Sequence, residues 1–270
     1  MNYFKFSTLK EDQKAQTPDW LLRWVKTSFG PFFDPCPPNP TFDGLSIPWK
    51  SVNFVNPPFD DIGLWMDKAS DELGRGKTSV FLIPFRAHTL YFKRNFHNIR
   101  ASMIFNQNIS FKGYTTPLPI ALHICIFSPT RLPTNILGLS KECVSYLSHV
   151  NTKTQLLKLA KSLCKDVTVI NNKLSEPLSS LLALKQKQNI SNFAVVCPTR
   201  FANKVFYSAF LRTTCIVFAN VTLSHGTSKF ATCILFFGPV KLPSQKLQLY
   251  SLDVQQIKQQ LTRTKAKISM

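Results

Sequence analysis

Acidic residues are scarce in this sequence, and so are the features of secreted and membrane-spanning proteins. Asp and Glu number 14 against 33 Lys and Arg, which gives a formal net charge of +19. The longest apolar stretch, residues 120–128, is too short to cross a bilayer and fits a buried strand. The first 16 residues have no apolar segment of the kind that a secretory signal requires. We therefore expect an intracellular protein with no membrane partner.

Cysteine pairs with a recognisable spacing are also missing. The seven cysteines are odd in number, none forms a C-x-x-C pair, and most lie inside apolar runs. This pattern predicts reduced thiols that fill a core, in a reducing compartment, with neither a disulfide framework nor a metal site.

The composition is 44% hydrophobic and 12% aromatic, which is typical of a packed globular protein. A surface with so large an excess of positive charge attracts polyanions, and nucleic acid is the usual one. The alternative is that the charge serves only solubility or assembly.

Helical and strand patterns alternate along the first half. Residues 1–16 are polar and are expected to form a flexible arm. Thr17 is placed to cap a helix that starts with Pro18 and ends at Gly30. Later helices are expected after residue 60 and at 89–97. Short apolar runs predict strands at 32–33, 52–55, 79–83, 101–111 and 120–127. This order indicates an α/β fold with a largely parallel sheet.

The second half repeats part of the first. Placing Pro198 on Pro84 also aligns Arg200 with Arg86, Phe206 with Phe92 and Phe210 with Phe96. After a short gap, residues 231–239 match 121–129, and upstream residues 169–174 match 54–59 to within one residue. We interpret residues 52–129 and 167–239 as two copies of one unit, although chance similarity between α/β segments is the alternative.

A chemically distinctive loop, Asn56-Pro57-Pro58-Phe59, follows directly on the strand that ends at Val55. Two prolines stiffen this loop and leave its carbonyls pointing outward. An exocyclic base amine is a poor nucleophile until two acceptors bind its hydrogens, and the Asn56 oxygen and the Pro57 carbonyl can be those acceptors. Phe59 can stack on a base that is flipped out of the helix. A plain strand-to-loop turn is the alternative.

The neighbours of this loop carry a family resemblance. The strings TPDWL (17–21), FFDPCPPNP (32–40), FDGL (42–45), FVNPPF (54–59) and LIPFRAHTLYF (82–92) occur in this order, with Trp49 between them. Together they resemble the phage-type DNA N6-adenine methyltransferase family over residues 17–129. The resemblance implies a Rossmann-like methyltransferase core, S-adenosylmethionine as methyl donor and adenine in DNA as acceptor.

The resemblance also implies roles for individual residues. Asn56, Pro57, Pro58 and Phe59 would form the catalytic loop, and Phe59 would also contact the substrate base. Cofactor binding would fall to Asp34 with Pro35, and to Thr17 with Pro18. Arg86 would contact phosphate or the cofactor carboxylate, although its recurrence as Arg200 favours a structural role nearly as well.

The chain has only 9 glycines and lacks the glycine-rich turn that holds the cofactor in many amino-methyltransferases. The resemblance implies that the D-P-C loop at 34–36 takes the place of this turn. In the second half, residues 171–174 (Asn-Asn-Lys-Leu) replace the N-P-P-F loop, so that copy should be catalytically inactive. We expect a catalytic domain at 17–130, a degenerate methyltransferase-like repeat at 131–245 that pairs with it as an intramolecular pseudo-dimer, and a basic polar tail at 246–270. A homodimer is the other arrangement considered.

Two other functions remain open at this stage. The same loop geometry would serve cytosine N4 or adenine in RNA. An inactive nucleic-acid-binding or assembly subunit with a methyltransferase fold is also compatible with the charge.

Overall fold

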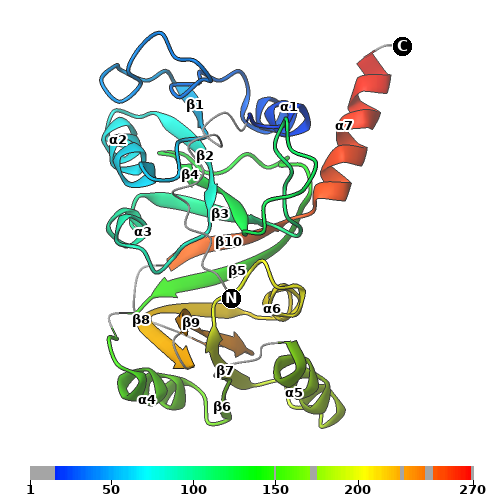
Figure 1. The fold of residues 1–270 in the computed structure, drawn as a ribbon. Coiled ribbons are helices and arrows are strands. Elements are labelled where there is room, and N and C mark those ends of the chain that lie inside the picture. The colour runs from blue at the N-terminus through cyan, green and yellow to red at the C-terminus, as the bar shows by residue number, and fades with distance from the viewer. Residues whose placement is uncertain (1–15, 149, 171–174, 226–227, 241–245, 269–270) are drawn as a thin grey trace.

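The computed structural model describes residues 16–148, 150–170, 175–225, 228–240 and 246–268, and these residues build one sheet with helices on both faces (Figure 1). The expected arm at 1–16 lies, except for Gln16, outside this range. The strands are β1 (Val52–Val55), β2 (Thr78–Pro84), β3 (Ile99–Phe105), β4 (Leu122–Phe127), β5 (Leu139–Leu147), β6 (Val167–Val169), β7 (Phe193–Pro198), β8 (Cys215–His225), β9 (Ser228–Phe237) and β10 (Lys246–Leu252). The helices are α1 (Asp19–Phe29), α2 (Ile62–Gly74), α3 (Leu90–Asn95), α4 (Lys153–Leu163), α5 (Ser175–Lys187), α6 (Lys204–Phe210) and α7 (Val254–Ile268).

The expected α/β fold is confirmed, and the sheet is mixed. Its strand order is β1-β2-β4-β3-β10-β5-β8-β9-β7-β6. The first five strands of this order share one direction except β4, and the last five share one direction except β9. The two halves run against each other because β10 and β5 are antiparallel. Each half is therefore largely parallel, as expected, but the sheet as a whole is not.

The two halves of the sheet have the same arrangement and the same register. Pro84 lies opposite Leu122 in the β2–β4 pair, and the matched Pro198 lies opposite Thr232 in the β7–β9 pair. The same alignment matches Ala101 of β3 with Cys215 of β8. Ala101 pairs with Gln248 of β10 and Cys215 pairs with Val144 of β5, so Gln248 and Val144 are equivalent residues as well. Gln248 and Val144 also pair with each other. Equivalent residues that pair with one another are what a local twofold axis between β10 and β5 requires.

Each half lends one strand to the other. The chain leaves β4 in the first half and enters β5, which pairs with β8 of the second half. It leaves β9 in the second half and enters β10, which pairs with β3 of the first half. Residues 246–252 are therefore a central strand, with Leu247, Leu249 and Leu252 at 1%, 0% and 0% exposure, and α7 follows it. This corrects the expectation of a polar tail at 246–270.

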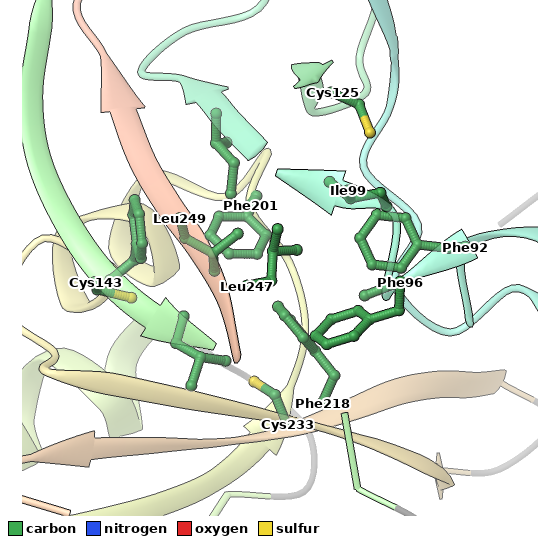
Figure 2. Packing of buried hydrophobic residues seen from close by; sticks show 14 of the residues in the cluster. Phe92, Phe96, Ile99, Cys125, Cys143, Phe201, Phe218, Cys233, Leu247 and Leu249 are labelled. Carbon is green, nitrogen blue, oxygen red and sulfur yellow. The ribbon is translucent and has the colours of Figure 1, made fainter. Parts of the chain in front are cut away.

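One hydrophobic core joins the halves and two others do not. On one face of the sheet, α2, α3, α5 and α6 contribute to a single cluster, and Figure 2 shows Phe92, Phe96 and Ile99 of the first half facing Phe218 and Cys233 of the second. Phe85 stacks edge-on against Phe201, at 4.8 Å between ring centroids. On the other face, α1 and α7 cover a core of the first half, and α4 covers a core of the second.

Two details refine the expected elements. The strand expected at 101–111 is β3, which ends at Phe105, and the one expected at 32–33 is a single parallel bridge between Phe33 and Asn53. None of the helices in the described part of the chain is long and apolar enough to cross a membrane.

Candidate active site

Three parallel strand segments end side by side at one edge of the first half. Phe33 pairs with Asn53 of β1, and β1 pairs with β2. The residues that follow these segments are Asp34, Asn56 and, after Pro84, Phe85 with Arg86. Ligands of open α/β sheets bind outside the carboxyl ends of parallel strands. The topology thus brings three of the sequence-predicted site positions to one edge.

Asn56 is held by Thr17. The Asn56 Nδ2 donates a hydrogen bond to Thr17 Oγ1 at 3.2 Å, across 39 residues of sequence. Thr17 is 8% exposed, and α1 begins two residues later with Pro18, not Thr17, as its N-cap. The sequence-based expectation that Thr17 caps this helix is therefore wrong, and its hydroxyl instead orients the Asn56 amide. No hydrogen bond to Asn56 Oδ1 occurs among the described residues, which leaves this acceptor open to a ligand.

The prolines that follow Asn56 form a turn into α2. The Pro58 carbonyl accepts from the Asp61 amide at 3.1 Å, and the Asp61 carbonyl accepts from the Leu64 amide at 3.0 Å. Within the described residues, no such partner engages the Pro57 carbonyl. Phe59 is half-buried and packs against both the shared core and the core beneath α1. The loop is thus anchored at Pro58 and Phe59, while Asn56 and Pro57 keep an acceptor each.

Asp34 is a half-buried carboxylate at the same edge. Its Oδ1 accepts from the Cys36 amide at 2.9 Å. Burial raises the pKa of Asp34, and this hydrogen bond partly counteracts the effect. Burial, together with the negative charges of Asp34 and Asp61, raises the pKa of the Cys36 thiol to about 12. Within the described residues neither aspartate has an ion-pair partner, although the chain carries +19.

Gly44 fixes the loop that carries Asp34. A Cβ added at Gly44 would lie 1.8 Å from the Pro35 carbonyl oxygen and 2.9 Å from the Trp65 ring, so only glycine fits. The Gly44 carbonyl accepts from Trp49 Nε1 at 2.8 Å. Pro35 is thus pressed against the FDGL segment from one side. In the sequence, Gly44 stands out only as part of the FDGL string, and its contact with Pro35 is formed only in the folded chain.

Arg86 forms the same backbone turn as Arg200. The Arg86 carbonyl accepts from the Thr89 amide at 3.0 Å, and the Arg200 carbonyl accepts from the Asn203 amide at 2.8 Å. The Arg86 side chain lies near Tyr91, whose pKa is raised by burial and lowered in part by the Arg86 charge. The shared turn gives the P-x-R tripeptide a structural role in both halves.

The second half lacks the surroundings of this site. Twenty-two residues (30–51) separate α1 from β1, but only residues 164–166 separate α4 from β6. By strand register, Val167 corresponds to Phe54 and Val169 to Asn56, a shift of two residues from the sequence alignment. That alignment is corrected accordingly. Residues 171–174, expected to replace N-P-P-F, lie outside the described residues.

Comparison with known proteins adds no relative. No protein-family model matches the chain, and no curated protein or solved structure matches it.

All seven cysteines are free, and six of them are buried, as the sequence predicts for core-filling thiols. Within the described residues, no group of three or more His, Cys, Asp or Glu could hold a metal ion.

Proposed function

We propose that the first half of the chain transfers a methyl group from S-adenosylmethionine to the exocyclic N6 of adenine in DNA. The observation that carries the proposal is the Asn56–Thr17 hydrogen bond at the carboxyl edge of β1. It orients an amide in a stiff N-P-P-F loop so that its oxygen stays available as an acceptor. The resemblance of residues 17–129 to phage-type adenine methyltransferases supports the choice of reaction.

The charges at this edge fit the cofactor. S-adenosylmethionine carries a sulfonium and an ammonium group, and Asp34 is a half-buried carboxylate without a basic partner among the described residues. We assign Asp34 and Pro35, with Thr17 and Pro18, to hold the cofactor. When bound, it supplies an electrophilic methyl group. The chain has no glycine-rich turn to hold the cofactor, and the loop that Gly44 fixes would serve in its place.

The chain's own residues activate the amine. Asn56 Oδ1 and the Pro57 carbonyl accept the two amine hydrogens, which draws the nitrogen lone pair out of the ring. With the cofactor bound, the two acceptors would hold this lone pair toward the methyl group that the cofactor supplies, and one amine proton would then leave to water. Phe59 stacks on the flipped base, at the cost of unstacking it from the duplex. Alignment of the reacting atoms accounts for the remainder of the rate.

We assign the second half to a supporting role, as a degenerate, duplicated partner in an intramolecular pseudo-dimer. The register match between the halves and the exchanged strands support a duplication. The short connection before β6 leaves no room for a counterpart of the Asp34 loop. Because β10 completes the first half, removal of the second half would leave β3 with an unpaired edge.

The test uses purified full-length protein, tritiated S-adenosylmethionine and DNA free of adenine methylation. Wild type is expected to transfer label to adenine N6, and Asn56→Ala to lose about 10²–10³ in rate, as when one transition-state hydrogen bond is removed. Asn135→Ala, at an exposed asparagine, is the matched control and should keep full activity. Label on cytosine N4 or on RNA would redirect the substrate. No transfer and no cofactor binding by calorimetry would instead favour a nucleic-acid-binding subunit.

A further inference from the structure

The C-terminal helix α7 is basic, follows the second half in the sequence and packs against the first half. Between Val254 and Ile268 it carries Lys258, Arg263, Lys265 and Lys267 and no acidic residue. Val254 and Ile257 are buried against the first half, at 1% and 0% exposure. The C-terminal part of the helix projects away from the body of the molecule (Figure 1). An anchored, projecting helix with this composition is suited to contact a polyanion.

α7 lies against α1 and adds to its charge. Lys258 Nζ lies 5.4 Å from the centroid of the Trp20 ring, a cation–π contact that joins the two helices. Gln260 Oε1 accepts from the Gly138 amide at 3.0 Å, which fixes the middle of α7. On α1, Arg23 and Lys26 are exposed. We call the surface formed by Arg23, Lys26, Lys258 and Arg263 the α1–α7 ridge.

The cations of this ridge have no acidic partners in the described part of the chain. Asp19, at the start of α1, is paired with Lys112 at 2.7 Å. The Asp253 carboxylate caps α7, accepting from the Gln255 and Gln256 amides at 2.9 and 3.0 Å. The four ridge cations appear in none of the ion pairs of the described residues. Their charge is therefore available to phosphates.

A chain of contacts links the ridge to the candidate active site. Asn56 bonds to Thr17, which lies two residues before Asp19 at the start of α1. The neighbouring Gln16 pairs with Lys112, whose ammonium reaches Asp19. Trp20, the residue after Asp19, lies beneath the Lys258 ammonium in the cation–π contact. The α1 part of the ridge therefore starts at Arg23, four residues after the start of a helix that follows directly on Thr17 and Pro18.

We propose that the α1–α7 ridge binds the sugar-phosphate backbone of the DNA beside the target adenine. Phosphate contacts of this kind position a protein on a duplex without reading its sequence. The location beside the target rests on the proposed function, but the binding itself does not. The second half would then supply an element that holds the substrate of the first.

The test compares two double variants of the full chain by fluorescence anisotropy with a labelled duplex. Lys258→Gln with Arg263→Gln removes two ridge cations, and Lys158→Gln with Lys161→Gln removes two exposed cations from α4. Between about 50 and 200 mM salt, the ridge variant should lower the slope of log affinity against log salt by about 2. The affinity of the ridge variant for DNA should fall on the order of tenfold at least, and by a similar factor for duplexes of different sequence. The α4 variant should stay close to wild type.

Equal losses in both variants would show a general charge effect and overturn the ridge. An unchanged ridge variant alongside an active wild type would also overturn it, while leaving the methyl-transfer proposal intact. Loss of DNA binding by the ridge variant alone, in a protein that neither binds cofactor nor transfers methyl, would uphold the ridge and remove the proposed function. Cofactor titration of the ridge variant by calorimetry should match wild type.

Discussion

Truncation of one side chain in β10 should destabilise both halves of the molecule together. Leu249 is fully buried and lies between Ser102 of β3 and Cys143 of β5, within the core that joins the halves. Leu249→Ala removes three carbons, worth about 2.4 kcal/mol at about 0.8 kcal/mol per buried methylene. The cavity left behind adds to this, so we expect a loss of about 3–5 kcal/mol in the free energy of unfolding.

The tryptophans make the cooperativity measurable. All four, at positions 20, 24, 49 and 65, belong to the first half, whereas helices of both halves contribute to far-ultraviolet circular dichroism. Urea unfolding followed by both signals should give coincident transitions in wild type and in Leu249→Ala, both shifted to lower urea. At about 2–4 °C per kcal/mol for a chain near this size, the melting temperature should fall by roughly 6–20 °C.

The control is Leu90→Ala, because Leu90 is 80% exposed at the start of α3. Its effect should stay within about 0.5 kcal/mol. In Leu249→Ala, the tryptophan signal could shift to lower urea while part of the circular dichroism signal unfolds at the wild-type urea concentration. That result would refute the shared core. A loss below about 1 kcal/mol for Leu249→Ala would refute the burial argument for β10 itself.

Three further changes test other parts of the structure. Thr17→Val, which removes the hydroxyl that holds Asn56, should lower the methyl-transfer rate by about tenfold, roughly the worth of one hydrogen bond, while Thr17→Ser should retain activity. Gly44→Ala, whose Cβ would meet Pro35 at 1.8 Å, should weaken cofactor binding in calorimetry, and Gly74→Ala, with open space around it, should not. Burial lowers the pKa of His123 to about 3 in the folded chain. Below pH 6.5 the unfolded chain therefore binds a proton at this residue, whereas the folded chain does not. Stability should therefore fall with pH from about 6.5 downward, by about 2 kcal/mol at pH 5 from this residue, and His123→Phe should reduce that slope in urea unfolding.

Local patterns predicted the strands better than their partners. The matches that placed Pro198 on Pro84 agree with the strand register of the structure. The exchange of β5 and β10 could not be predicted, because apolar alternation marks a strand without showing which neighbour it pairs with. Residues 246–252 illustrate this limit: they alternate as K-L-Q-L-Y-S-L, but the basic, glutamine-rich segment that follows favoured a tail.

The candidate site was predictable where it depended on strand ends. Asp34, Asn56 and Arg86 each follow an apolar run, so the sequence could place them at one edge of a parallel sheet. The role of Thr17 was not predictable in the same way. A threonine before proline and aspartate favours a helix cap, and only a contact across 39 residues turns its hydroxyl toward Asn56 instead. Thr152, directly before α4, does cap its helix, accepting from the Gln155 amide at 3.2 Å.

Under our proposal, the way in which the two halves are joined explains why an inactive copy would persist. The second half keeps the strand register, the P-x-R turn and the aromatic side of the shared core, all of which support the fold. It lacks the long loop before its first strand, which in the first half carries Asp34 and Gly44. Because β10 fills the gap between β3 and β5, loss of the second half would open the first half's sheet beside β3 and take α7 with it. Selection on the first half for stability and, under our proposal, for DNA contact would therefore preserve the framework of the second without preserving its chemistry.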